Sequence, residues 1–237
     1  AELHYFEQRD LRMLSGKAIG VSTRLTVHDD DKDWYDLGER QEIDLGDLDV
    51  ILMRKDPPFD MEYVYATYIL DRAKLAGALI VNAPQALRDM NEKVYTAWFP
   101  ECTPLTLVTR SMDEIKSFLA EHQRIVVKPL DGMGGRSIFV VRKGDNNANV
   151  IFETLTDYGR RFAMAQVFIP EIADGDKRIL LIDGEPVPYA LARIPTGDDN
   201  RGNIVAGATT RGQELSAADM RICAQVGPVL KEQGVLF

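Results

Sequence analysis

Three glycines within four residues constrain this chain more than any other feature of the sequence; they are Gly132, Gly134 and Gly135. They join two β-rich runs, residues 124–128 and 137–141, and the first run ends in Lys128. Because glycine has no Cβ, such a turn adopts backbone angles closed to other residues and can point several N–H groups at one place. Converging N–H groups bind anions, and Lys128 and Arg136 add positive charge. The stretch therefore predicts a turn that holds a polyphosphate.

Two familiar phosphate-binding loops do not match this stretch. A P-loop needs Gly-Lys-Ser/Thr at the start of a helix, and a dinucleotide fingerprint needs a helix after its glycines. Here a β-rich run follows the glycines. A glycine turn between two strands, with a lysine on a strand, is closer to the way protein kinases cover nucleotide phosphates. On these residues alone, a hairpin turn without a ligand stays open as the alternative.

Composition excludes several other classes of function. The 237 residues suit one large or two modest domains, and 45% hydrophobic with 27% charged residues is typical of a soluble globular protein. A net charge of −9 argues against nucleic-acid binding, and no apolar run is long enough to span a membrane. Two cysteines without metal-binding spacing indicate a reduced, cytoplasmic location. Three scattered histidines argue against a zinc site or a histidine-based triad.

The first third of the chain predicts an α/β unit. Short strands with a hairpin at Ser15-Gly16 are followed by an acidic stretch, residues 29–47, that we expect to be irregular. A strand over 49–53, a helix capped by Asp60 and a strand over 79–82 then predict a parallel strand–helix–strand unit. Arg54 follows the first of these strands, at the sheet edge where α/β proteins bind ligands.

The rest of the chain predicts further helices and antiparallel strands. Residues 83–99 are expected to be largely helical, and residues 162–169 form a strand that ends at a proline. Asp183-Gly184 between two apolar runs predicts a hairpin. Residues 194–213 are rich in glycine and polar residues, so we expect a structureless loop, which at that length is usually functional or mobile.

The order of motifs resembles that of bacterial glutathione synthetases, which are ATP-grasp ligases. In chain order the motifs are RKDPPFD at 54–60, NEK at 91–93, KPLDGMGG at 128–135, DGDKR at 174–178, GEPVP at 184–188, ARIP at 192–195 and RGN at 201–203. The resemblance covers essentially the whole chain. It implies an α/β ATP-grasp fold preceded by a Rossmann-like α/β domain. It also implies three parts: residues 1–84, residues 85–160 with the glycine turn, and residues 161–237.

The resemblance also implies a reaction. The family joins γ-glutamylcysteine to glycine with ATP and Mg²⁺, passes through an acyl phosphate, and releases ADP and phosphate. The implied partners are therefore small molecules, and the implied assembly is a homotetramer. Two alternatives stay open: another ATP-grasp amino-acid ligase, and a nucleotide-binding module without catalysis.

Site residues follow from the resemblance by position. The residues implied to hold ATP are Lys93, Lys128, Gly132, Gly134, Gly135, Gln166, Phe168, Ile169 and Asp176. Arg178 and Arg193 are the implied catalytic cations near the transferred phosphoryl group. Arg54, Arg193 and Asn203 are implied to bind the peptide substrate, and residues 194–213 to form a lid that excludes water from the acyl phosphate.

Each of these roles has a plainer alternative. Lys93 could be a solvated lysine, and Arg178 and Arg193 could simply pair with Asp176 or Glu185. The loop 194–213 could have no role.

The chain departs from the family pattern at both ends. It begins at Ala1 in one strand-like run and ends at Phe237 in another, so we expect it to be truncated at both ends. The acidic residues and the asparagine that bind Mg²⁺ in the family would follow Phe237, and we assign no metal ligand.

Overall fold

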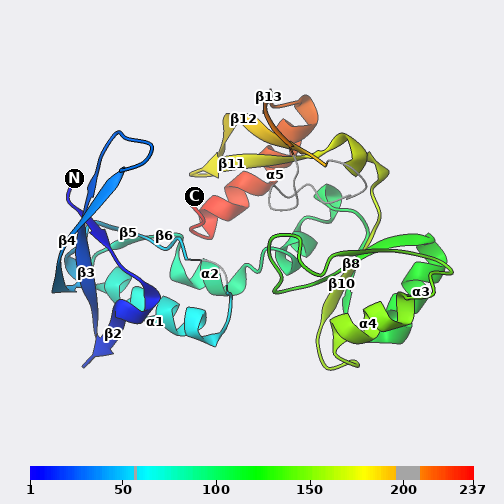
Figure 1. Ribbon diagram of the computed structural model, residues 1–237, viewed down its shortest axis with the longest axis horizontal. Coiled ribbons are helices and arrows are strands. Elements are labelled where there is room, and N and C mark those ends of the chain that lie inside the picture. Colours follow the sequence, from blue (N-terminus) through cyan, green and yellow to red (C-terminus); the bar gives the residue numbers. More distant parts are fainter. Residues whose placement is uncertain (56–57, 196–208) are drawn as a thin grey trace. The chain divides into compact units, whose positions relative to one another are not determined.

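The computed structural model describes residues 1–55, 58–195 and 209–237 (Figure 1). Two compact units make up the chain: residues 1–89 with 233–236, and residues 90–232 with Phe237. The boundaries expected after residues 84 and 160 stay predictions. Within the described ranges, no helix has both the length and the apolar content needed to cross a bilayer.

An antiparallel sheet of four strands forms much of the first unit. Its long strand β3 (Lys17–Val27) pairs with β1 (Leu3–Tyr5), β2 (Leu11–Leu14) and β4 (Tyr35–Asp44). The hairpin expected at Ser15-Gly16 is confirmed, because these two residues join β2 to β3.

Strand β4 corrects the expectation that residues 29–47 are irregular. Its ten residues pair with β3, but eight of them are exposed, so the strand lacks the apolar alternation that marks a half-buried strand. Backbone pairing holds it instead, together with the ion pairs Arg12–Glu42 and Arg40–Asp10. Pairing through the backbone does not require an alternating side-chain pattern, so the sequence did not predict this strand.

The predicted parallel strand–helix–strand unit is confirmed. Strands β5 (Val50–Leu52) and β6 (Leu79–Val81) pair in parallel, and α1 (Met61–Ala76) connects them. Asp60 caps the helix, since its Oδ1 accepts from the Tyr63 N–H at 2.9 Å. Leu70 of α1 and Ile80 of β6 are almost fully buried in the core of this unit. The short α2 (Pro84–Asp89) follows.

The second unit contains two antiparallel sheets. The first has the strand order β7 (Thr106–Thr109), β10 (Ala163–Val167), β8 (Arg124–Pro129), β9 (Phe139–Arg142). Helices α3 (Met112–His122) and α4 (Ala148–Thr156) lie together on one face of it (Figure 1). Ile115, Ile125, Val127 and Phe152 are completely buried between sheet and helices.

The second sheet of this unit has the order β11 (Asp176–Ile182), β12 (Glu185–Ile194), β13 (Thr209–Glu214). The predicted hairpin at Asp183-Gly184 is confirmed, because it joins β11 to β12. Helix α5 (Ala217–Glu232) packs against this sheet (Figure 1). Strand β13 corrects the end of the loop expected over 194–213, since its backbone pairs with β12 although its residues are mostly exposed and polar.

The expectation of helix over residues 83–99 is only partly right. Helix α2 ends at Asp89, and a short 3-10 helix, η3 (Val94–Trp98), follows after a turn. Asn91 sits in this turn and binds the N–H groups of Lys93 and Val94, each at 3.0 Å, so the asparagine side chain favours a turn over continued helix.

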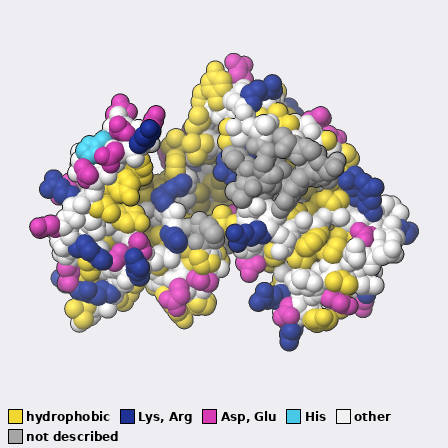
Figure 2. Space-filling view, viewed as in Figure 1, with side chains coloured by type: hydrophobic (Ala, Val, Ile, Leu, Met, Phe, Trp, Pro, Cys, Tyr) yellow, Lys and Arg dark blue, Asp and Glu magenta, His cyan; other side chains and the backbone are white. Residues whose placement is uncertain are grey.

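On the face shown in Figure 2, basic and acidic side chains are interspersed over both units. Among the described residues of that face there is no continuous basic stripe of the kind that nucleic-acid binding requires.

Candidate active site

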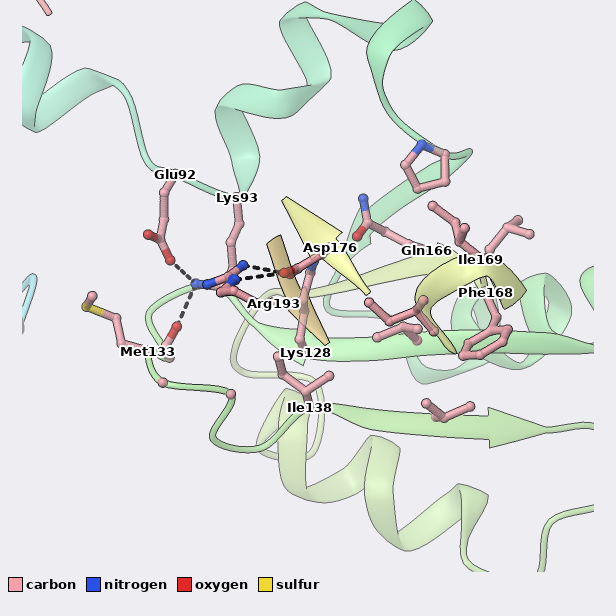
Figure 3. Close-up of a pocket in the computed structure, with 18 of the residues that line it drawn as sticks. Glu92, Lys93, Lys128, Met133, Ile138, Gln166, Phe168, Ile169, Asp176 and Arg193 are labelled. Atoms are coloured by element: carbon pink, nitrogen blue, oxygen red, sulfur yellow. Dashed lines mark hydrogen bonds and ion pairs between the residues drawn. The ribbon is translucent and has the colours of Figure 1, made fainter. Parts of the chain in front are cut away.

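A cavity of about 890 Å³ lies within the second unit and contains most of the predicted site residues (Figure 3). Its walls come from the ends of β8, β9 and β10, the glycine turn, the turn before η3, and the first residues of β11 with the end of β12. This volume is in the range that binds small molecules and cofactors.

Strand β8 provides one wall through its two-residue periodicity. Val126 and Lys128 line the cavity, whereas Ile125 and Val127 between them are completely buried in the core. Lys128 stands at the end of the strand, directly before the glycine turn. Burial, followed by repulsion from Lys93, lowers the pKa of Lys128, while Glu92 acts in the opposite direction. The site therefore places two cations close together in a partly desolvated region.

Lys93 is not the solvated lysine of the plainer alternative. Only 12% of its side chain is exposed, and its Nζ donates to the Gly132 carbonyl at 2.6 Å and to Glu92 at 2.5 Å (Figure 3). The Asn91 amide also donates to the Leu130 carbonyl at 3.3 Å. Asn91 and Lys93 thus tie their turn to the glycine turn. The sequence assigned no role to Asn91, although asparagine is a recognisable turn residue.

The glycine turn has the backbone expected of it. Gly134 and Gly135 have φ of 64° and 76°, values that glycine adopts without strain. A Cβ on Gly132 would lie 2.8 Å from Cγ of Pro129, so this position has no room for a side chain. All three glycines line the cavity, whereas Arg136 is exposed and is not among the described lining residues.

Asp176 and Arg193 form a bidentate ion pair at the opposite wall. They are register partners on β11 and β12, and Arg193 donates to both carboxylate oxygens, from Nε at 2.7 Å and from a terminal nitrogen at 2.6 Å (Figure 3). The pairing alternative for Arg193 is thus correct, yet both residues also line the cavity. Arg178 lines the cavity two residues after Asp176, and no described carboxylate pairs with it. Its guanidinium has donors available for an anion.

The end of β10 forms the other end of the cavity. The N–H of Val167 donates to the Leu105 carbonyl at 3.1 Å, and that of Phe168 to the Arg124 carbonyl at 3.2 Å. The Gln166 amide donates to the Thr106 hydroxyl at 2.8 Å. Among described residues, none accepts from the Ile169 N–H, which lines the cavity with a donor to spare.

Two predicted substrate-binding residues are not among the described residues that line this cavity. Arg54 follows β5 in the first unit, and its part in the site stays a prediction. Asn203 and most of the expected lid, residues 196–208, lie outside the described residues. In the described ranges, no three His, Cys, Asp or Glu side chains converge to hold a metal ion.

Family comparisons match the chain along its length. A model described as "Prokaryotic glutathione synthetase, N-terminal domain" matches residues 1–88, and one described as "Prokaryotic glutathione synthetase, ATP-grasp domain" matches residues 92–237. Glutathione synthetase of Vibrio parahaemolyticus is 56% identical over 236 residues, which are 100% of this chain and 75% of that protein. Glutathione synthetase of an Escherichia coli strain is 55% identical over the same shares.

Solved structures share the fold at low sequence identity. D-cycloserine synthetase aligns with a TM-score of 0.58 and 15% identity over 81% of this chain and 69% of its own. D-alanyl-alanine synthetase A from Vibrio cholerae aligns with a TM-score of 0.54 and 13% identity over 94% of this chain and 69% of its own. The ATP-grasp ligase PsnB, in a complex with a minimal precursor, Mg and ADP, aligns with a TM-score of 0.57 and 16% identity over 90% of this chain and 69% of its own.

Proposed function

This chain belongs to the prokaryotic glutathione synthetase family and is an ATP-dependent ligase that forms glutathione; we propose that the cavity of its second unit binds the ATP. One observation carries the proposal. The two lysines, the glycine turn, the Asp176–Arg193 pair and the end of β10 line a single cavity of about 890 Å³.

The proposed position of ATP follows from the charges of this cavity. Its phosphates lie between Lys93 and Lys128 under the N–H groups of the glycine turn, because phosphoryl transfer relies on positioned positive charge. Its adenine lies against Phe168 at the other end, where the Ile169 N–H, from which no described residue accepts, donates to a ring nitrogen. Gln166 keeps this segment in place through its bond to Thr106.

The proposed reaction has two steps. A carboxylate oxygen of γ-glutamylcysteine attacks the terminal phosphorus of ATP, and ADP leaves with the electron pair of the broken P–O bond. The glycine amine then attacks the carbonyl carbon of the acyl phosphate, loses a proton and expels phosphate. Arg178 and Arg193 stabilise the charge on the transferred phosphoryl group and on the carbonyl oxygen. Asp176 orients Arg193 through their bidentate ion pair, and Arg54 and Asn203 stay predicted contacts of the peptide substrate.

ATP-grasp ligases use ATP with Mg²⁺, and we propose the same here. When bound, such an ion would neutralise phosphate charge. Residues 1–55, 58–195 and 209–237 hold no converging set of metal ligands. These residues therefore do not fit the ion by themselves, and the roles above rest on the protein's own side chains.

Assembly and location are also proposals. The family resemblance suggests a homotetramer, and association of some kind is supported by apolar side chains left exposed on one face of the first unit's sheet: Leu3, Tyr5, Val27 and Leu37. Light scattering tests this, and a mass other than four chains contradicts it. A cytoplasmic location is supported by Cys102 and Cys223, which are free thiols.

The test of function is phosphate release from ATP with γ-glutamylcysteine and glycine, each omitted in turn. We expect release only when both substrates are present, together with stoichiometric glutathione. Release that ignores the identity of the amino acid would favour another ATP-grasp ligase. Nucleotide binding without release under any condition would favour a module without catalysis.

A further inference from the structure

Arg124 makes two contacts with the same cavity residue. Its guanidinium carbon lies 3.4 Å from the centroid of the Phe168 ring, and its carbonyl accepts from the Phe168 N–H at 3.2 Å. Phe168 lines the cavity at the end that holds Gln166 and Ile169, away from Lys93 and Arg193 (Figure 3). Arg124 therefore touches the base end of the proposed ATP site through both backbone and side chain.

The position of Arg124 on β8 explains how it reaches Phe168. Side chains alternate along a strand, so Arg124 shares a face with Val126 and Lys128, which line the cavity. Arg124 and Lys128 stand four residues apart, roughly 13 Å along the strand. One strand face thus provides a cation for the phosphates at one end and a cation behind Phe168 at the other.

The surroundings of Arg124 are otherwise unfavourable for a cation. Its Nε is buried and has no hydrogen-bond partner among the described residues, and none of their carboxylates forms an ion pair with it. Arg142 faces it across the strand pair. Burial, then repulsion from Arg142, lowers the pKa of Arg124. An aromatic face attracts a guanidinium, most strongly where water is excluded, so the Phe168 ring is the partner that makes this position tolerable.

We propose that Arg124 is a positioning residue for the base of the nucleotide: its guanidinium holds the Phe168 ring in place, and with it the adenine-binding segment 168–169. This inference rests on the proposed ATP site and deepens it. Arg124 does not touch the phosphates, so its effect belongs to ligands that carry a base. Its loss weakens binding of ADP and leaves binding of inorganic tripolyphosphate unchanged.

The experiment compares Arg124→Met with Arg142→Met in the full chain. Calorimetry gives the Kd of each variant for ADP and for tripolyphosphate. Cation–π contacts of this kind are expected to change affinity by roughly 3- to 30-fold. We expect Arg124→Met to weaken ADP binding by that factor and to keep tripolyphosphate binding. Arg142→Met removes the neighbouring charge without the aromatic contact and should match the parent for both ligands, while Arg124→Lys, which keeps a cation but loses the planar stack, should fall between.

A double-mutant cycle with Phe168→Leu makes the test independent of general damage. If Arg124 acts through the ring, Arg124→Met has no further effect on ADP binding in the Phe168→Leu background. Unchanged ADP affinity in Arg124→Met, an equal loss for both ligands, an equal effect of Arg142→Met, or additive effects in the cycle would each overturn the inference. Failure of the parent protein to bind ADP would instead contradict the proposed ATP site, so the two failures are distinguishable.

Discussion

The two ends of the proposed ATP cavity are held together by different interactions. We call the part around Lys93, Lys128 and Arg193 the phosphate end, and the part around Gln166, Phe168 and Ile169 the base end. At the phosphate end, charged side chains face one another: Lys93 with Glu92, and Arg193 with Asp176. At the base end, the end of β10 is held by backbone bonds to Leu105 and Arg124 and by the packing of Phe168. The first end is organised by charge, and the second by backbone geometry and an aromatic ring.

This difference suggests how each end prepares for its ligand. Two lysines near each other in a partly buried site repel, and part of that repulsion is offset by internal carboxylates until a polyphosphate arrives. At the base end the N–H groups of Val167 and Phe168 already donate to backbone carbonyls, whereas no described residue accepts from the Ile169 N–H, which we propose as a donor to the base. We therefore expect changes at the phosphate end to have large and pH-dependent effects, and changes at the base end to have small effects that vanish for ligands without a base.

The largest effect is expected from Arg193→Lys. Lysine keeps the charge but loses the planar fork that binds both oxygens of Asp176. Without this orientation, stabilisation of the transition state is lost, and kcat for glutathione formation should fall roughly 100- to 1,000-fold, with little change in ADP affinity.

Lys177→Met is the matched control for Arg193→Lys. Lys177 lies on β11 beside Asp176 but pairs with Asp219 of α5 at 2.6 Å, on the other face of the sheet. It should keep kcat and lose at most about 1 kcal/mol of unfolding free energy. If Arg193→Lys also kept kcat, charge alone would suffice at this wall and the assigned orienting role would be wrong.

Lys128→Met should have the next largest effect, on binding. Hydrogen bonds to charged groups contribute about 1.5–3 kcal/mol, so the Kd for ADP should rise roughly 10- to 100-fold. Because the lysine contacts phosphate, tripolyphosphate should lose affinity by the same factor, unlike the Arg124→Met pattern. Calorimetry with both ligands decides this, and unchanged affinity for either would remove Lys128 from the phosphate site.

The same lysine predicts a pH dependence of ADP binding. The pKa of Lys128 lies below its ordinary value in the free protein, mainly because of burial. Phosphate binds the protonated form, so affinity falls as the pH rises through this lowered pKa, and it does so at a lower pH than for an exposed lysine. Kd values measured from pH 7 to 10 should show this decline in the parent and a flatter profile in Lys128→Met. Equal slopes would place the titrating group elsewhere.

Sequence reasoning worked where side-chain chemistry decides the structure. The glycine turn, the capped helix α1 and the hairpin at Asp183-Gly184 follow from local rules, and all three are found. Strands β4 and β13 were missed because their pairing is made by the backbone, and their mostly exposed side chains carry no apolar period. Such strands can be recognised only from the structure, where they pair with β3 and β12.

The site shows a similar division. The residues proposed to touch ATP could be named because they stand at positions of motifs that resemble the family's, and lysine, arginine and glycine at those positions agree with phosphate chemistry. The residues that keep those side chains and loops in position could not be named from the sequence. Asn91, Thr106 and Arg124 act through contacts 39, 60 and 44 positions away in sequence, with Leu130, Gln166 and Phe168. No local sequence pattern predicts such contacts.

Gly132→Ala should have an intermediate effect. The added methyl group would lie 2.8 Å from Cγ of Pro129 and 3.3 Å from the Arg136 carbonyl, so the turn must move. Such overpacking costs about 1–3 kcal/mol, and we expect about 10-fold weaker binding of both ADP and tripolyphosphate. At Gly38, the nearest atom is 3.4 Å from the position of a Cβ, and Gly38→Ala is therefore the control that should bind both ligands normally. Loss of ADP binding alone would mean that the glycine turn acts on the base of the nucleotide and not on its phosphates.

The smallest effect is expected from Thr106→Val. Valine has nearly the same shape but removes the hydroxyl, which accepts from the Gln166 amide at 2.8 Å and donates to the Pro104 carbonyl at 2.7 Å; the bond to Gln166 is the one that concerns the base end. A neutral hydrogen bond contributes about 0.5–1.5 kcal/mol, so ADP binding should weaken only about 3-fold. Because Gln166 lies at the base end, tripolyphosphate binding and the pH profile should both stay as in the parent. A loss for tripolyphosphate as well would show that the two ends are coupled through β10, and that charge and backbone geometry do not act separately in this cavity.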